Sequence, residues 1–343
     1  MLPTVSLIVP ARNEEKVIGK CVRSLLNLDY PRDKLELIVA IDGSKDRTLE
    51  ICKSFGRRVR VIKSCPKTCK GDALNNVIPK AKGEIIGIYD ADCIVDKNCL
   101  KHAVKHFSDK KIAGVCGNLK SHNKEQGMIA RSLALETSFI SFIEYFLNSL
   151  GANTHFFGKN MFIRKNVLMD VGCFDTETFV EDVEMSIKLK KYGYKTVFEP
   201  NAIAWNEEPP SFRAFFKQRI RWARGAAKLL KYKRRHGKEF LSDAMHGIYF
   251  YVPPFGLITA TVLAIVMQFG LPFFLILPFI VLFMFNMVLL VYSRIKFKEP
   301  MGDLLYLPVW FVLSNVHLVL LLKGLLDEKM EKSVSWNSVR AFS

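Results

Sequence analysis

The sequence has few acidic residues and no paired cysteine motif. Lysine and arginine total 50 against 33 aspartates and glutamates, which gives a net charge of +17. The eight cysteines are scattered. Neither Cys65 and Cys69 nor Cys93 and Cys99 have the CxxC spacing of a structural zinc site. The sequence therefore predicts reduced thiols in the cytosol and argues against a zinc-stabilised fold.

The N-terminus lacks a long apolar run. The apolar segment at residues 5–9 is too short for a signal peptide and leads directly into the charged residues 12–15. We therefore expect the N-terminal part of the chain to remain in the cytoplasm.

Long apolar runs are confined to the C-terminal part. Residues 248–269, 271–292 and 304–322 each approach the ~20 apolar residues that cross a bilayer. None has a polar face, so we expect about three transmembrane helices within residues 246–324, followed by a charged tail at 325–343. Prolines and tyrosines in the first run leave open that it is a broken or interfacial helix.

The distribution of basic residues predicts the orientation. Lysines and arginines are concentrated in 228–238, before the first run, and in 294–298, after the second. The connection at 268–270 is uncharged, so the large N-terminal domain is expected to be cytoplasmic on a multi-pass protein of the cell membrane. Because the basic cluster adjoins a predicted span, we expect anionic lipid and a nucleotide as partners, and no nucleic acid.

Residues 1–210 have the pattern of an α/β domain. Short apolar strands at 5–9, 35–41, 59–62 and 85–89 alternate with three helical segments, at 15–26, 47–52 and 71–80. This alternation predicts a mostly parallel central sheet with helices on both faces. Ligands bind beyond the carboxyl ends of strands in such sheets.

Two aspartates follow the last of these strands directly. In an extended segment, Asp90 and Asp92 would point the same way, with Ala91 turned away. One or two carboxylates completed by water and phosphate oxygens are a usual way of holding Mg²⁺ or Mn²⁺. The alternative is an ordinary strand-to-loop turn, which aspartate also favours.

Other polar clusters follow the earlier strands. Residues 10–14 follow the first strand and 42–46 follow the second, so three clusters are expected at one edge of the sheet. The segment 70–75 places Lys70 at a predicted helix N-terminus, where amides and an ammonium favour an anion. The alternative for Lys70 is a solvated lysine.

Glu181 and Asp182 open an amphipathic helix. A carboxylate here could remove a proton from an attacking hydroxyl group, or the pair could only complement the helix dipole.

The segment Gln218, Arg219, Ile220, Arg221 and Trp222 lies in an amphipathic region, 211–245. An arginine can clamp a pyrophosphate, and an indole can stack on a sugar ring. The alternative, which does not exclude this role, is an interfacial helix.

Together these motifs resemble the family 2 glycosyltransferases of the GT-A fold over nearly the whole chain. The segment 218–222 is similar to the Gln-x-x-Arg-Trp motif of cellulose, chitin and hyaluronan synthases. The resemblance implies a GT-A domain with a mostly parallel sheet, followed by interfacial helices and a C-terminal transmembrane helix bundle. In the second loop Ile41 replaces the first of two aspartates that the family often has before its glycine, so Asp42 is the one aspartate of that pair in this chain.

The resemblance also implies roles for individual residues. The expected catalytic base is Asp182, and the expected ligands of Mg²⁺ or Mn²⁺ are Asp92 and Asp90. The residues expected to bind the nucleotide-sugar donor are Pro10, Arg12, Glu14, Asp42, Lys70, Asp90 and Arg221. Those expected at the acceptor site are Glu181, Gln218, Arg219 and Trp222.

The implied function is membrane-associated, inverting transfer of a sugar from UDP-hexose or UDP-N-acetylhexosamine to a lipid-linked or polysaccharide acceptor. Two alternatives stay open: a processive polysaccharide synthase and a non-catalytic nucleotide-sugar-binding membrane subunit. A homo-oligomer or an auxiliary subunit is a possible further partner.

Overall fold

The computed structural model describes residues 2–64, 69–176, 180–236, 268 and 277–329. The chain divides into two compact units. The first comprises Met1–His122, Ile143–Glu207 and Val334–Ser343, and we call it the sheet unit. The second comprises Asn123–Phe142 and Glu208–Ser333, and we call it the helical unit.

The sheet unit is built on one mixed sheet with the strand order β3-β2-β1-β4-β7-β6-β8-β5. The four strands predicted from the sequence are parallel neighbours: β1 (Val5–Ala11), β2 (Leu35–Asp42), β3 (Arg60–Ser64) and β4 (Ile85–Ile88). The remaining strands are β5 (Ile94–Val95), β6 (Ile112–Ser121), β7 (Met161–Arg164) and β8 (Lys195–Asn206).

The later strands break the parallel pattern. Strand β7 is antiparallel to both β4 and β6, and β5 is antiparallel to β8, while β6 and β8 are parallel. The predicted parallel sheet is therefore present in the first four strands, and the sheet becomes mixed beyond β4.

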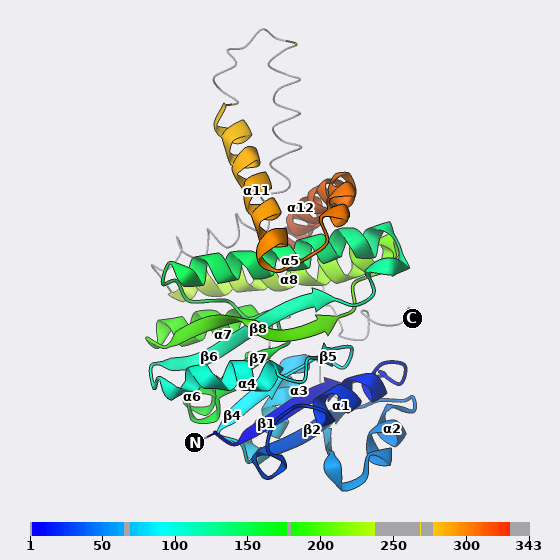
Figure 1. Cartoon of the computed structure of the whole chain (residues 1–343), viewed down its shortest axis with the longest axis vertical. Coiled ribbons are helices and arrows are strands. Elements are labelled where there is room, and N and C mark those ends of the chain that lie inside the picture. The colour runs from blue at the N-terminus through cyan, green and yellow to red at the C-terminus, as the bar shows by residue number, and fades with distance from the viewer. Residues whose placement is uncertain (1, 65–68, 177–179, 237–267, 269–276, 330–343) are drawn as a thin grey trace. The chain divides into compact units, whose positions relative to one another are not determined.

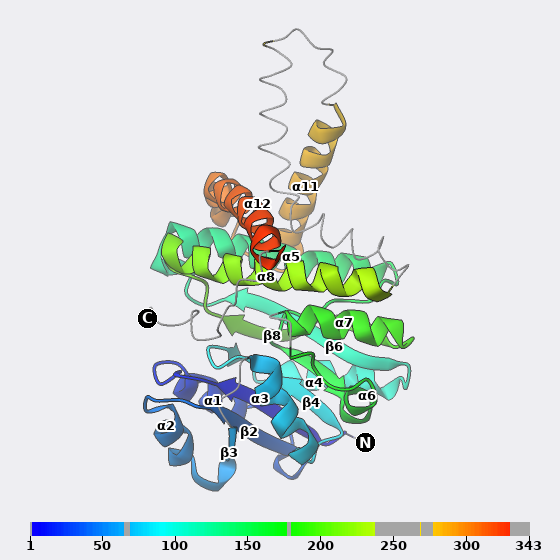
Figure 2. The same ribbon diagram turned by 180° about the vertical axis from the view of Figure 1, so that it is seen from behind.

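Helices cover both faces of the sheet. All seven residues of β1 are buried, as expected for a central strand. Helices α1 (Ile18–Leu26) and α4 (Cys99–Val104) share one apolar core with β1 and β2, and α3 (Lys70–Val77) covers the opposite face (Figures 1 and 2). The other helices of this unit are α2 (Thr48–Ser54), α6 (Lys165–Asp170) and α7 (Glu181–Lys191).

The helical unit contains long helices. They are α8 (Phe212–His236), α11 (Leu277–Lys296), α12 (Leu307–Lys329) and the first part of α5 (Met128–Ser149). A 3-10 helix, Met301–Tyr306, leads into α12. Helix α12 packs along α8, with the two backbones close at Gly324, where a side chain would meet the carbonyl carbon of Ala223 at 2.7 Å.

One helix among the described residues, Met301–Gly324, is long and apolar enough to cross a membrane. It contains the predicted run 304–322, and 28% of its most apolar stretch is buried. The run 248–269 lies outside the described residues except for Gln268, and the run 271–292 is described only from Leu277 onward. A bundle of three spans is therefore not confirmed.

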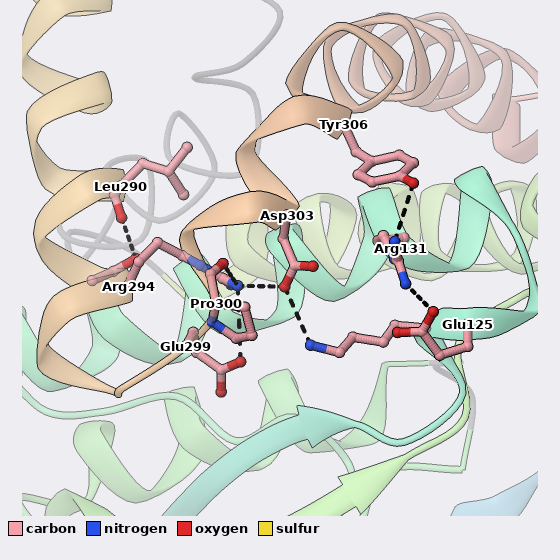
Figure 3. A network of polar contacts seen from close by, with 10 residues as sticks. Glu125, Arg131, Leu290, Arg294, Glu299, Pro300, Asp303 and Tyr306 are labelled. Atoms are coloured by element: carbon pink, nitrogen blue, oxygen red, sulfur yellow. Dashed lines mark hydrogen bonds and ion pairs between the residues drawn. The ribbon is translucent and has the colours of Figure 1, made fainter.

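An ionic network joins the turn between α11 and α12 to the segment before α5 (Figure 3). Arg294 is 1% exposed and lies 2.5 Å from Asp303, which also pairs with Lys124 at 3.3 Å. The guanidinium of Arg294 also donates a hydrogen bond of 2.7 Å to the carbonyl of Pro300. Because Arg294 is buried, the charge of Asp303 is needed to compensate it.

We predict that Asp303→Asn lowers the free energy of unfolding by about 3 kcal/mol, because it leaves Arg294 buried without its main counter-charge. Urea denaturation of the detergent-solubilised protein measures this loss. Glu125→Gln is the control, because Glu125 is 74% exposed and its pair with Arg131 should contribute less than about 1 kcal/mol. Equal losses in the two variants would contradict the prediction.

Candidate functional site

The loops after β1 and β2 are joined by hydrogen bonds. Asn13 adopts a left-handed conformation with φ of 58°, and its backbone N–H donates to Ser44 Oγ at 3.1 Å. In return, Asn13 Oδ1 accepts from the N–H of Lys45 at 2.8 Å. The N–H of Glu14 donates to Thr48 Oγ1 at 2.7 Å, which brings Glu14 to the start of α2. The two predicted loops thus form one polar edge.

A partly buried ion pair lies at the same edge. Asp42 ends β2, is fully buried and lies 3.4 Å from Arg12 Nη1. Pro10 pairs with Ala40 near the end of β1, and it lies beyond Ile8, the last residue of β1 that pairs with β4. Its missing N–H therefore removes no hydrogen bond from the ladder with β4.

Lys70 is the centre of a second group. Its ammonium lies 2.7 Å from Asp90 Oδ1 and 3.5 Å from Glu181 Oε1, and it donates a hydrogen bond of 2.5 Å to the carbonyl of Gly158. Burial alone would lower the pKa of Lys70, but Asp90 and Glu181 outweigh burial and raise it above its usual value. The lysine is therefore protonated and connects α3, the end of β4, α7 and the loop before β7.

Asp182 lies beside this lysine at the start of α7. Burial, strengthened by the neighbouring charge of Glu181, raises the pKa of Asp182 to about 7, and Lys70 partly opposes the increase. A carboxyl group that titrates near neutral pH can both accept and release a proton at the pH of a cell. Asp182 therefore has the properties of a general base, and Glu181 contributes to them.

Asp90 and Asp92 are both partly exposed, while Ala91 between them is buried. The segment is a turn, with the N–H of Cys93 donating to the carbonyl of Asp90, and not the extended strand that the sequence suggested. The described residues contain no group of three or more acidic, histidine or cysteine side chains placed to hold a metal. The carboxylate oxygens of Asp90 and Asp92 are accessible and suit Mg²⁺ or Mn²⁺, provided that phosphate and water oxygens supply the remaining ligands.

The loop before α7 is anchored to α3. Asn75 Nδ2 donates to the carbonyl of Phe174 at 2.8 Å, and the N–H of Phe174 donates back to Asn75 Oδ1 at 3.0 Å. A side chain at Gly71 would meet the carbonyl oxygen of Asp175 at 2.8 Å. The segment 70–75 therefore does more than supply a lysine, because it also holds the chain that leads to Asp182.

The sequence did not reveal the role of Gly158. Its φ is +73°, and a side chain there would meet Asp182 Oδ2 at 3.0 Å and Lys70 Nζ at 3.4 Å. From the sequence, the segment 156–160 suits either a part of the acceptor pocket or an ordinary packed turn, and neither predicts these contacts of Gly158.

The predicted residues of segment 218–222 all lie on α8, in the helical unit. Arg219 is 2% exposed and lies 2.6 Å from Glu136 Oε1, whereas Gln218, Arg221 and Trp222 are partly exposed. Their roles with donor or acceptor stay predictions.

A family model described as glycosyltransferase like family 2 matches residues 3–225. The probable glycosyltransferase YdaM of Bacillus subtilis is 33% identical over 65% of this chain and 55% of its own. The poly-beta-1,6-N-acetyl-D-glucosamine synthase of Staphylococcus epidermidis is 30% identical over 66% of this chain and 55% of its own. The beta-monoglucosyldiacylglycerol synthase of Trichormus variabilis is 31% identical over 65% of this chain and 49% of its own. The chain spans about half the length of these relatives.

A solved structure shares the fold. The mannosyltransferase PcManGT from Pyrobaculum calidifontis, in complex with GDP-Man and Mn²⁺, has a TM-score of 0.67 and 22% identity. The match covers 96% of this chain and 88% of the other.

The pKa of Asp182 predicts a pH-dependent stability. The carboxyl ionises near pH 4 in an unfolded chain but at about 7 in the folded protein, so stability should fall as the pH rises between these values. Asp182→Asn removes this loss and should raise the free energy of unfolding by on the order of 2 kcal/mol at pH 8, with little change at pH 4. Urea denaturation at both pH values measures the difference, and an effect independent of pH would refute the assignment.

Proposed function

This chain belongs to glycosyltransferase family 2 and has the GT-A fold, and we propose that it is an inverting, metal-dependent transferase anchored in the cell membrane. Its donor is UDP-hexose or UDP-N-acetylhexosamine. Its acceptor is a lipid-linked sugar or lipid at the cytoplasmic face. The observation that carries the proposal is the cluster in which Lys70 bridges Asp90 and Glu181, beside a carboxyl group of raised pKa at Asp182.

The cluster supplies the two activities that sugar transfer needs. Asp182 accepts the proton of the acceptor hydroxyl as its oxygen bonds to the sugar and the sugar–phosphate bond breaks, which releases the nucleotide diphosphate. Burial, together with the charge of Glu181, keeps the pKa of Asp182 high enough for this task. The protonated Lys70 favours the negative charge of a diphosphate. A non-catalytic binding subunit would not need a base of this kind next to the phosphate-binding lysine.

Asp90 and Asp92 would hold the divalent ion. When bound, Mg²⁺ or Mn²⁺ supplies positive charge that stabilises the departing diphosphate. The presence of Mn²⁺ with GDP-Man in the structural relative supports this part of the proposal.

The first polar edge is assigned to the nucleotide. The pair Arg12–Asp42 and the loop through Glu14 lie at the carboxyl ends of β1 and β2, where ligands of α/β sheets bind. We assign Asp42 and Arg12 to the base and ribose. In the helical unit, Arg221 retains the proposed phosphate role, and Gln218 and Trp222 retain the proposed acceptor roles.

The apolar helix Met301–Gly324 supports an anchored enzyme with a lipid acceptor, and the relative from Trichormus is named for a diacylglycerol product. A second candidate is a polysaccharide acceptor, which is favoured by the name of the Staphylococcus relative. Vesicles of phosphatidylglycerol with and without diacylglycerol, and a soluble oligomer of N-acetylglucosamine, distinguish these acceptors when each is incubated with radiolabelled nucleotide sugars.

We predict that transfer requires Mn²⁺ or Mg²⁺. Excess EDTA should stop sugar transfer, and Asp92→Asn should reduce metal-dependent UDP binding by at least about tenfold, because too few oxygen ligands remain. Calorimetry with UDP measures binding with and without the ion. Asp29→Asn is the control, because Asp29 is 59% exposed and pairs with Lys101. Full transfer in EDTA would overturn metal dependence.

We predict that Asp182→Asn abolishes transfer but leaves donor affinity within about tenfold, as expected for a group that acts mainly in the transition state. In the wild-type protein, kcat/KM should rise with pH through about 7, because the base must be ionised. The exposed Asp170→Asn serves as the control. Transfer by the Asp182 variant at the wild-type rate would assign the base to another residue.

A further inference from the structure

Arg219 is a buried cation in the helical unit, held by a carboxylate from another helix. Its Nη2 lies 2.6 Å from Glu136 Oε1 on α5, and the other carboxylate oxygen of Glu136 accepts a hydrogen bond of 3.1 Å from Trp310 Nε1 on α12. Glu136 therefore binds one side chain on α8 and one on α12, and it fixes one end of the guanidinium of Arg219.

The guanidinium of Arg219 lies over two aromatic rings. Its central carbon is 4.3 Å from the ring centroid of Trp222 and 5.2 Å from that of Phe215. Its Nε and Nη1 are buried, and within the described residues neither donates to a nitrogen or oxygen atom. The two ring faces therefore stabilise the positive charge of the guanidinium through cation–π contacts.

A ring from α12 also lies near the indole of Trp222. The ring of His317, which is 7% exposed, has its centroid 6.4 Å from that of Trp222. Trp222 itself stays partly exposed. The ring is therefore held by a cation and an imidazole while part of its surface remains accessible.

A neighbouring ion pair shows that helix packing alone does not require this arrangement. Arg224, also on α8, donates to Asp327 Oδ2 on α12 from Nε at 3.1 Å and from Nη2 at 2.7 Å. This pair satisfies both nitrogens with a carboxylate and links the same two helices. Within the described residues, two nitrogens of Arg219, Nε and Nη1, instead have no nitrogen or oxygen acceptor while the guanidinium lies over Trp222, which a packing role does not explain.

We propose that Arg219, oriented by Glu136, is a positioning residue that fixes the indole of Trp222 for the sugar of the acceptor. The inference rests on the proposed acceptor role of Trp222 and gives Arg219 an indirect role in place of the expected contact with the acceptor, because its side chain is 2% exposed. The role requires a planar cation. Lysine keeps the charge next to Glu136 but cannot present a flat face to the ring.

The test compares Arg219→Lys, Glu136→Gln and Trp222→Ala with the control Arg224→Lys in the full-length protein. Radiolabelled UDP-glucose and UDP-N-acetylglucosamine are supplied with vesicles of phosphatidylglycerol carrying diacylglycerol, or with the soluble oligomer. Arg219→Lys and Glu136→Gln should lower kcat/KM for the acceptor by about tenfold or more, with the donor KM within about threefold. Arg224→Lys should leave both values within about threefold.

A spectroscopic measurement keeps the inference testable without turnover. The fluorescence of Trp222 is isolated by subtracting the signal of the matching Trp222→Phe protein. Arg219→Lys should increase acrylamide quenching and lower the anisotropy of this residue, and Arg224→Lys should change neither. Unchanged fluorescence in Arg219→Lys would overturn the positioning role.

The outcomes separate the two proposals. If Trp222→Ala transfers like the wild type, or if the wild type uses neither acceptor, the proposed acceptor site is wrong. If Trp222→Ala is impaired but Arg219→Lys has a normal acceptor kcat/KM, only the inference about Arg219 is wrong. Equal impairment in Arg219→Lys and Arg224→Lys would mean that both arginines serve helix packing, which would also overturn the inference.

Discussion

The ammonium group of Lys70 is the interaction on which the candidate site depends. Carboxylates from the end of β4 and the start of α7 would repel each other if they met without a cation, and Lys70 lies 2.7 Å from Asp90 and 3.5 Å from Glu181. Because it also binds the carbonyl of Gly158, the same group fixes the loop before β7. Helix α3 must therefore begin at this lysine, and the reciprocal bonds of Asn75 with Phe174 hold α7 within its reach.

The sequence predicts the first half of the sheet much better than the second. Strands β1 to β4 are short apolar runs between helical segments, and this alternation specifies parallel neighbours. Strand β5 has two residues and β7 has four, which is too short for any periodic signal. Their antiparallel pairing is determined by contacts with β8 and β6 that are distant in the sequence.

The candidate site, like the sheet, has features that the local sequence predicts and others that depend on residues distant in the sequence. The chemical roles of Lys70, Asp90 and Asp182 stay predictions, and that of Asp182 follows from the family resemblance. Their positions near helix and strand ends could be predicted from the sequence. The pairing of Lys70 with carboxylates could not, because the partners lie 20 or more positions away and charge alone suits a phosphate equally well. Arg219 is a similar case: its position in a basic, aromatic segment suggested contact with a ligand, and only the fold reveals Glu136 as its partner.

The close approach of α12 to α8 has a consequence for how the helical unit is assembled. Gly324 and Ala223 have almost no side-chain volume, and a Cβ at Gly324 would lie 2.7 Å from the carbonyl carbon of Ala223, so the two helices can approach this closely only with a glycine there. Gly324 lies two helical turns, about 10 Å, beyond His317 on the same helix, and Ala223 directly follows Trp222. A bulkier residue at Gly324 would therefore push α8 and α12 apart and increase the distance between the imidazole and the indole without contacting either ring.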